Sequence, residues 1–191
     1  MEKRERLEQL QDRNIYATEE SMIRWVEFTG ENAEFHNAMH CFLMRGLDSE
    51  DVSVNFIGQT DAVSYAALKV LEMPLTLTVV HGGEEPAYAY YMDGKPSTRA
   101  AVLDSFIIEE ALLNMEDTGR YVWDILNEFF DCHDIRLGAV DLTFAHLAEH
   151  FIVLCGELTP NTMMLFDPET GKRLWSGEEG AYELIMQRIS G

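Results

Sequence analysis

The strongest constraint on the fold is a two-residue period between positions 75 and 80. Leu75, Leu77 and Val79 alternate with Thr76 and Thr78, as in a strand that buries one face and exposes the other. Such a strand needs partner strands and an apolar core on its buried side, so the chain must build a sheet. Runs rich in β-branched and aromatic residues predict other strands at positions 15–28, 52–57, 87–92, 140–144 and 151–155, with a further apolar block at 66–71.

Helical patterns lie between these strands. Positions 121–130 place their apolar side chains on one stripe at helical spacing, which predicts an amphipathic helix. Helices are also expected at 38–47, 109–115 and 181–189, the first ending near Gly46. The opening residues 2–13 are dense in helix formers and charge, so they fit either a short surface helix or a frayed lead-in. Because the chain contains no internal repeat, this mixture predicts an α+β fold with mostly local antiparallel pairing.

The charge balance restricts the partners. Thirty-four acidic residues stand against fourteen basic ones, which gives a formal net charge of −20. This charge repels nucleic-acid backbones and anionic membrane surfaces, so neither is an expected partner. It also disfavours a diffusing polyanion such as ATP, unless a local basic pocket overrides it. The expected partner is an unidentified small molecule or protein, and a homo-oligomer is compatible with the sequence.

The cysteines and the hydropathy pattern indicate the compartment. Cys41, Cys132 and Cys155 form no close-spaced pair, which argues against a disulfide framework and against a thiolate zinc site. No apolar run approaches the roughly 20 residues that cross a bilayer, and the charged start lacks a signal-peptide core. We therefore expect a soluble, cytoplasmic protein without a resident cofactor.

The sharpest local pattern is His146-Leu-Ala-Glu149-His150, which matches a zinc motif in which two histidines four apart on a helix bind the metal. Strands are expected on both sides, so we interpret the segment as a hairpin connection in which the two imidazoles share no helical face. No distant third ligand is identifiable, and we predict no metal site there. A metalloprotein centred on His146 and His150 is the weakest alternative.

Two other polar groups have structural interpretations. Cys132 and His133 fit a helix-end cluster, because a nucleophile and its base usually come from separated positions in the sequence. His36, His40 and Cys41 lie near the start of an expected helix. Histidine and cysteine are common half-buried residues, so packing is the expected role of this second group.

Residues 156–167 carry the most specific pattern in the chain. They read Gly-Glu-Leu-Thr-Pro-Asn-Thr-Met-Met-Leu-Phe-Asp and resemble the signature Asp-Glu-Ile-Ser-Pro-Asp-Thr-Cys-Arg-Leu-Trp-Asp of the SAICAR synthetases, which are ATP-dependent ligases of purine biosynthesis. Weaker matches in the same order occur at 15–19, 26–29, 54–61, 73–80, 103–110 and 135–144. The resemblance implies a small N-terminal antiparallel-sheet lobe, residues 1–72, and a larger α+β lobe, residues 73–191.

The chain differs from this family at the positions that bind phosphate and magnesium in the family. The family's lysine-containing phosphate hairpin corresponds to residues 10–13, where its glycine and lysines are gone, and the next phosphate-side segment is missing between Phe35 and Asn37. The positions of two magnesium-binding carboxylates are occupied by Ala145 and Gly156, which supply no side-chain oxygen. Other polar or cationic positions of the family correspond to Thr143, Val80, His81 and Met164.

These departures imply that ligation is lost, because ATP-dependent activation of a carboxylate relies on metal and cations that neutralise phosphate charge. We predict a binding or interaction module without catalytic residues, in which Asp104, Glu157 and His81 are the polar groups near the old cleft. The alternative is a divergent active ligase, or another small-molecule enzyme that uses replacement residues such as His81, His146 or Cys155.

Overall fold

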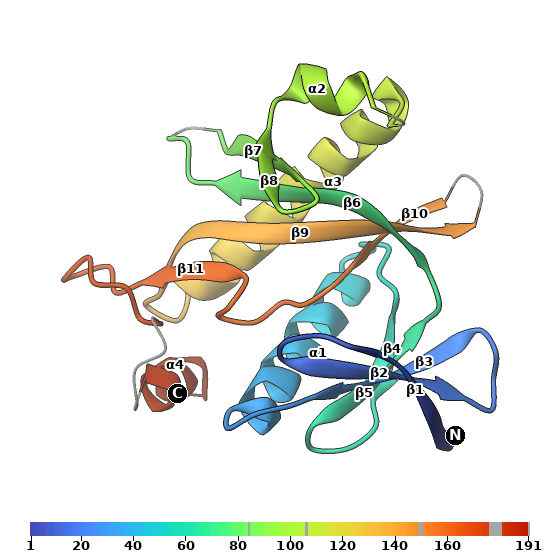
Figure 1. The fold of residues 1–191 in the computed structure, drawn as a ribbon. Coiled ribbons are helices and arrows are strands. Elements are labelled where there is room, and N and C mark those ends of the chain that lie inside the picture. The colour runs from blue at the N-terminus through green and yellow to red at the C-terminus, as the bar shows by residue number, and fades with distance from the viewer. Residues whose placement is uncertain (84, 106, 149–150, 176–180, 191) are drawn as a thin grey trace. The chain divides into compact units, whose positions relative to one another are not determined.

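The computed structural model describes residues 1–83, 85–105, 107–148, 151–175 and 181–190. The chain divides into two compact units, one of residues 1–73 with 145–159 and one of residues 74–144 with 160–191 (Figure 1). The segment 145–159, which the sequence placed in the second lobe, is thus grouped with the first unit. A parallel bridge between Val54 and Leu154 accounts for this, since the Asn55 N–H donates to the Leu154 carbonyl at 3.0 Å.

The first unit contains a five-stranded antiparallel sheet in the order β1-β2-β3-β5-β4. The expected strand region 15–28 contains two strands, and the strand expected at 52–57 begins only at Phe56. The strands are β1 (Lys3–Gln9), β2 (Arg13–Thr18), β3 (Ile23–Phe28), β4 (Phe56–Gln59) and β5 (Ser64–Leu68).

Residues 2–13 do not form the helix or frayed lead-in expected from the sequence. They contain β1, an edge strand that pairs with β2 from Lys3–Thr18 to Gln9–Asn14. Every residue of β1 is exposed, so a helix here would have had no buried face to stabilise it. Lys3 anchors the strand, because its Nζ lies 2.5 Å from Glu27 Oε1 and 3.9 Å from the centre of the Tyr16 ring. Strand pairing therefore overrides local helix propensity.

Helix α1 (Ala33–Ser49) packs on this sheet and is longer than predicted. Gly46 does not end the helix, which continues to a C-cap at Glu50. The core between helix and sheet joins side chains of α1 to side chains of β3 and β5: it consists of Val26, Phe28, Ala33, Cys41, Tyr65 and Ala67. His36 and His40 are buried as well, which confirms packing as the role of the group around Cys41.

The second unit contains most of a six-stranded sheet in the order β10-β9-β6-β7-β8, with β11 also paired to β9. The alternation at 75–80 is confirmed, because Leu75, Leu77 and Val79 are at most 1% exposed. The strands are β6 (Leu71–Val80), β7 (Ala87–Met92), β8 (Lys95–Ser97), β9 (Arg136–Ala148), β10 (Phe151–Cys155) and β11 (Met163–Phe166). The first residues of β6, the end of β9 and all of β10 belong to the first unit.

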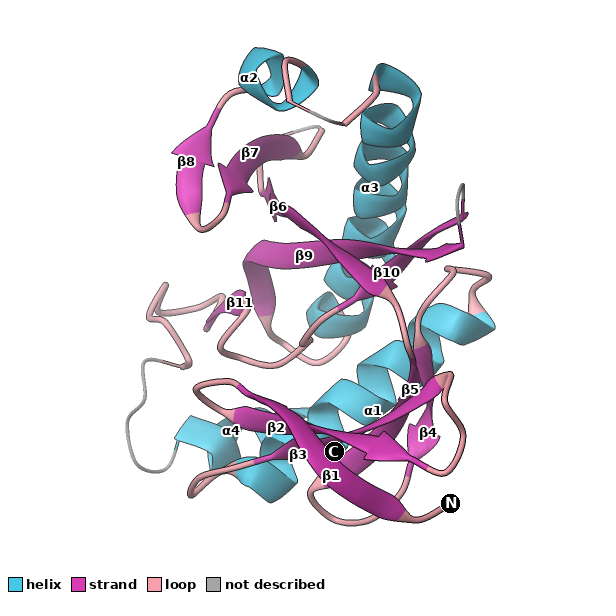
Figure 2. Ribbon diagram, turned by 45° about the vertical axis from the view of Figure 1, so that its right-hand side comes forward, coloured by secondary structure: helices cyan, strands magenta, loops and turns pink. Residues whose placement is uncertain are grey.

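Helices α2 (Arg99–Leu103), α3 (Glu109–Asp131) and α4 (Ala181–Ser190) complete the second unit. The two helices expected at 109–115 and 121–130 form one continuous helix, α3, which crosses one face of the sheet at β6 and β9 (Figure 2). Gly119 permits this close approach, because a Cβ at that position would lie 2.9 Å from Leu77 Cδ2. Among the described residues, no helix is both long enough and apolar enough to cross a membrane.

Candidate functional site

The first unit contains a pocket of about 390 Å³ on the sheet and on the segment that leads into β6. We call it the first-unit pocket. Its walls are mainly apolar, and Leu7 and Leu71 are exposed beside it. The charged residues that line it are of both signs: Glu8, Arg13, Arg24, Lys69 and Glu72. Leu10, Arg13 and Gly156 contribute to the lining, so this pocket collects positions that the family resemblance assigns to phosphate and magnesium.

Arg13, the first residue of β2, lies between two carboxylates. Its Nη1 is 3.7 Å from Glu157 Oε2, and its Nε is 3.8 Å from Asp12 Oδ1. The side chains of Arg13 and Glu157 are only 19% and 5% exposed, so solvent screens the Arg13–Glu157 pair weakly. Thr159 fixes the carboxylate further, because its hydroxyl donates to Glu157 Oε1. The guanidinium is therefore already neutralised within the unit.

Burial is the largest influence on Glu157, and together with a hydrogen bond to Asp12 it raises the pKa of Glu157 to about 7. The Thr159 hydroxyl and the Arg13 charge act in the opposite direction without cancelling this rise. Glu157 therefore changes its charge near neutral pH, where an isolated glutamate would already have released its proton.

His40 and Tyr65 form a buried, uncharged pair of rings, and Tyr65 lines the same pocket as Arg13. His40 is fully buried, its Nδ1 accepts a hydrogen bond from the Leu158 N–H at 3.2 Å, and its ring centre lies 4.3 Å from that of Tyr65. Burial, assisted by the Arg13 charge, lowers the pKa of His40 to about 3. Burial also raises the pKa of Tyr65 well above its usual range. Neither group titrates near neutral pH, so both act through packing.

The residues of the first unit do not fit a magnesium ion at the positions that the resemblance implies. Ala145 is fully buried in an apolar cluster with Val153 and Cys155. Gly156 lines the first-unit pocket in a left-handed turn with φ of 86°. Neither position offers a side-chain carboxylate, the ligand that the resemblance implies for the metal. No group of three potential metal ligands occurs within the part of the chain that the structure describes.

The zinc motif is not helical where the structure describes it. His146 lies within strand β9, which extends further than the expected strand 140–144, so it is not in the hairpin connection where the sequence placed it. Its Nδ1 is buried without a described hydrogen-bond partner. Glu149 and His150 lie outside the described residues. The Cys132–His133 group is at the C-terminal end of α3, where His133 Nδ1 contacts the Phe129 carbonyl at 2.7 Å. This confirms the helix-end interpretation.

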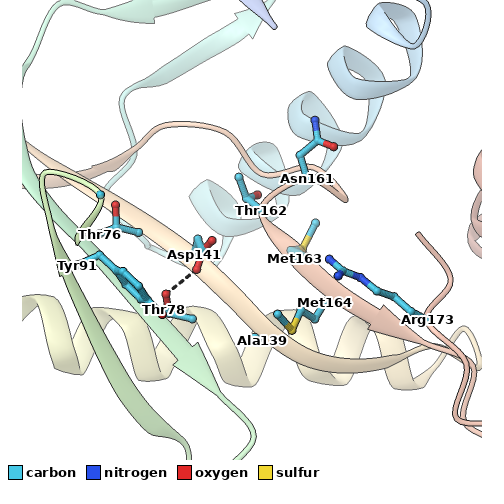
Figure 3. A pocket seen from close by; sticks show the side chains of 11 residues that line it. Thr76, Thr78, Tyr91, Ala139, Asp141, Asn161, Thr162, Met163, Met164 and Arg173 are labelled. Carbon is cyan, nitrogen blue, oxygen red and sulfur yellow. Dashed lines mark hydrogen bonds between the residues drawn. The ribbon is translucent and has the colours of Figure 1, made fainter. Parts of the chain in front are cut away.

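The second unit contains a polar pocket of about 420 Å³ on the exposed side of its sheet (Figure 3). We call it the second-unit pocket. Thr76 and Thr78 of β6 and Asp141 of β9 point into it because they occupy the outward positions of strands whose alternate residues are buried. The Thr78 hydroxyl donates to Asp141 Oδ1 at 2.6 Å. Other lining residues are Tyr91, Gly94, Ala139, Asn161, Thr162, Met163, Met164 and Arg173.

The loop before β11 and the chain after it complete the second-unit pocket. The Asp141 N–H donates to the Thr162 carbonyl at 2.8 Å, which holds this loop against β9. Trp175 Nε1 donates to Asn161 Oδ1 at 3.1 Å. Arg173 reaches into the pocket on the side away from Tyr91 (Figure 3). The pocket thus offers hydroxyl groups, one carboxylate and one guanidinium.

The three site residues predicted from the sequence lie in different surroundings. Glu157 is buried beside Arg13, next to the first-unit pocket. Asp104 is an exposed C-cap of α2, and His81 is an exposed residue after β6 whose ring centre lies 6.4 Å from that of Trp123. No described interaction joins Asp104 to His81, and neither lines either pocket.

Sequence reasoning missed three residues that define these pockets. Arg13 was noted only as part of a stretch that had lost its lysines, and Asp141 was not among the predicted site residues. Arg173 was not considered at all. A usable signal existed for Asp141, because an aspartate within an apolar strand exposes its carboxylate when its neighbours Val140 and Leu142 face the core.

No model of a known protein family matches the chain. The chain is similar to phosphoribosylaminoimidazole-succinocarboxamide synthase of Bacillus cytotoxicus, with 26% identity over 236 aligned positions that cover all of this chain and 98% of the relative. The enzyme of the same name from Deinococcus deserti is 28% identical over 115 positions, which are 54% of this chain and 48% of the relative.

Solved structures share the fold. The crystal structure of phosphoribosylaminoimidazole-succinocarboxamide synthase from Ehrlichia chaffeensis matches with a TM-score of 0.88 and 18% identity, over 97% of this chain and 98% of the other. A SAICAR synthetase in complex with ADP also matches with a TM-score of 0.88 and 18% identity, over 98% of each chain. The expected α+β fold is therefore confirmed. The chain is thus similar in sequence to phosphoribosylaminoimidazole-succinocarboxamide synthases and has the fold of the SAICAR synthetases.

Proposed function

We propose that this protein has lost ATP- and magnesium-dependent ligation and acts as a module that binds a small molecule in the second-unit pocket. The observation that carries the proposal is the neutralised Arg13. This residue lines the first-unit pocket in the stretch that corresponds to the family's phosphate hairpin, yet its charge is balanced by Glu157 and Asp12. A triphosphate would have to compete with Asp12 and with the ionised fraction of Glu157 for one guanidinium.

The other basic residues of the first-unit pocket do little to change this balance. The guanidinium of Arg24 donates to the Ser21 and Ile23 carbonyls at 3.1 and 3.0 Å. Lys69 shares the lining with Glu8 and Glu72. The pocket therefore lacks the concentration of positive charge that would be needed to override a net protein charge of −20.

The chemistry of ligation makes the combined losses severe. Phosphoryl transfer depends on metal ions and cations that neutralise developing charge, and removing a single such group typically costs about 10²- to 10³-fold in rate. Ala145 and Gly156 supply no side-chain metal ligands, and Arg13 is paired internally. One matching SAICAR synthetase binds ADP, so the fold itself is compatible with a nucleotide. We attribute the loss to these side chains and not to the scaffold.

The experiment is a ligation assay with an active control. Purified protein is incubated with MgATP and the substrates of the relatives, and phosphoribosylaminoimidazole-succinocarboxamide is quantified by mass spectrometry. The Bacillus cytotoxicus synthase, similar over its full length, serves as the positive control. We expect no product above the enzyme-free background. Product formed in repeated turnovers, and in proportion to protein concentration, would refute the proposal.

The second candidate function is a divergent but active synthetase. Collinear similarity over all of this chain and 98% of the Bacillus cytotoxicus enzyme favours it, because a chain under no constraint from the family's chemistry has less reason to retain the whole framework. This candidate predicts turnover in the same assay, and it further predicts that turnover requires magnesium.

A further inference from the structure

Arg173 is the cation that lines the second-unit pocket. Among the described residues, no carboxylate lies within ion-pair distance of its guanidinium, although the protein carries 34 acidic residues. Its side chain extends towards Met163 and the interior of the pocket (Figure 3). A guanidinium in such a place is an anion-binding group, and none of its five donors has an acceptor within the part of the chain that the structure describes.

The backbone holds Arg173 in a fixed position. Residues 166 and 173 form an antiparallel bridge, and the Leu174 N–H donates to the Leu165 carbonyl at 2.8 Å. The turn between them is fastened by Asp167, whose Oδ1 accepts hydrogen bonds from the Thr170 N–H at 2.7 Å and hydroxyl at 2.8 Å. The other oxygen of Asp167 pairs with Arg188 of α4. Arg173 thus stands on a braced hairpin, which reduces the ordering cost of binding.

Asp141 is the complementary group in the same pocket. Its Oδ1 accepts a hydrogen bond from Thr78, and no described partner occupies its Oδ2. Arg173 and Asp141 are the charged residues among those that line the pocket, so their charges sum to zero. A dianionic phosphate would be attracted by one group and repelled by the other. A ligand that carries one negative and one positive group would satisfy both.

We infer that Arg173 is the anion anchor of the second-unit pocket, and that the pocket selects a small zwitterion. The carboxylate of the ligand pairs with Arg173 and its ammonium group pairs with Asp141, while the hydroxyls of Thr76 and Thr78 and the side chains of Met163 and Met164 surround the connecting atoms. This inference rests on the proposed binding function of the pocket and adds the class of ligand and the residue that selects it.

The test uses ω-amino acids of increasing length, namely glycine, β-alanine and γ-aminobutyrate, with acetate and ethylammonium as single-charge controls. Binding is followed by NMR of protein labelled with ¹³C at the methionine methyl groups, because Met163 and Met164 line the pocket. Their signals are assigned with Met163→Leu and Met164→Leu. We expect one length of zwitterion to shift these signals saturably, with an affinity at least about tenfold above that of either control.

The matched variants are Arg173→Gln and Lys172→Gln, which remove the same charge from adjacent residues, only the first of which lines the pocket. Arg173→Gln should weaken the binding of the zwitterion by at least about tenfold, and Lys172→Gln should leave it within about twofold. Unchanged methyl signals elsewhere show that each variant is folded. Parental affinity in Arg173→Gln, an equal loss in Lys172→Gln, or equal affinity for acetate and every zwitterion would overturn the inference.

The result of the zwitterion titration is independent of the result of the ligation assay. Turnover in the ligation assay would end the proposal of lost chemistry and leave the role of Arg173 standing. Failure of every zwitterion to bind would end the inference about Arg173 and leave the neutralised Arg13 unaffected.

Discussion

Replacing Glu157 with glutamine should remove a large pH dependence from the stability of the protein. The carboxyl is 5% exposed and keeps its proton to a pH of about 7, against a reference value of 4.5. Between these values the folded protein holds a proton that the unfolded chain has released. The free energy of unfolding therefore falls as pH rises from about 4.5 to 7, and the stability present in acid is lost at neutral pH.

The size of the effect follows from the shift. A difference of roughly 2.5 pKa units at about 1.36 kcal/mol per unit corresponds to about 3 kcal/mol. The weak exposure of Glu157 means that solvent screening reduces this figure only slightly. Glu157→Gln keeps the size and the acceptor for the Thr159 hydroxyl but cannot ionise. The free energy of unfolding of the variant minus that of the parent should rise by up to about 3 kcal/mol between pH 4.5 and pH 8.

The assay is urea unfolding at a series of pH values, followed by fluorescence of the three tryptophans. Taking the difference between variant and parent cancels the repulsion that the remaining acidic residues contribute. Glu27→Gln is the matched control. Burial acts to raise the pKa of Glu27, but hydrogen bonds from Lys3 and Tyr16 outweigh it and lower this pKa. The stabilisation from ionised Glu27 is lost as pH falls, so its profile should slope the opposite way.

If the free energy of unfolding of Glu157→Gln minus that of the parent does not change with pH, Glu157 ionises normally. A slope of the same sign as that of Glu27→Gln would show that Arg13 favours the ionised carboxylate more than burial opposes it. Either result would refute the claim that burial keeps Glu157 protonated beside Arg13 up to a pH of about 7.

Three further predictions concern packing, an ion pair and the thiols. Gly138→Ala should lower stability by about 1–3 kcal/mol in thermal unfolding, because a Cβ there would lie 2.4 Å from Phe166 Cε2; an unchanged melting temperature would contradict this. A hydrogen bond from the Thr170 N–H and an ion pair to α4 lower the pKa of Asp167. Asp167→Asn should therefore be less stable than the parent at pH 7 and as stable as the parent in strong acid. Urea unfolding at both pH values checks this. A thiol reagent should label only Cys132 in the folded protein and all three cysteines after denaturation, because the other two are buried; early labelling of a second thiol would argue against their burial.

Much of the framework could be predicted from the sequence because its signals are local. The alternation at 75–80 and the aromatic run at 87–92 each marked a strand, since a half-buried pleated surface leaves a two-residue period. The stripe at 121–130 likewise marked part of α3. Residues 2–13 were misjudged because their conformation depends on pairing with residues 14–18, and β1 has no buried face to leave a pattern.

The sites were harder to predict because they are assembled from distant segments. Glu157 was expected near a cleft from its place in the signature, but its raised pKa depends on Asp12 and Arg13 at the other end of the chain. Arg173 lines its pocket only because a turn folds it back beside β11. Neither relationship leaves a periodicity or a spacing in the sequence.

The central claim is that the fold of a purine-pathway ligase persists here without the groups that handle a triphosphate. Isothermal titration of the protein with MgATP, repeated without magnesium, tests it most directly. We predict no saturable heat below millimolar nucleotide and no difference between the two titrations. Micromolar binding that requires magnesium would contradict the claim.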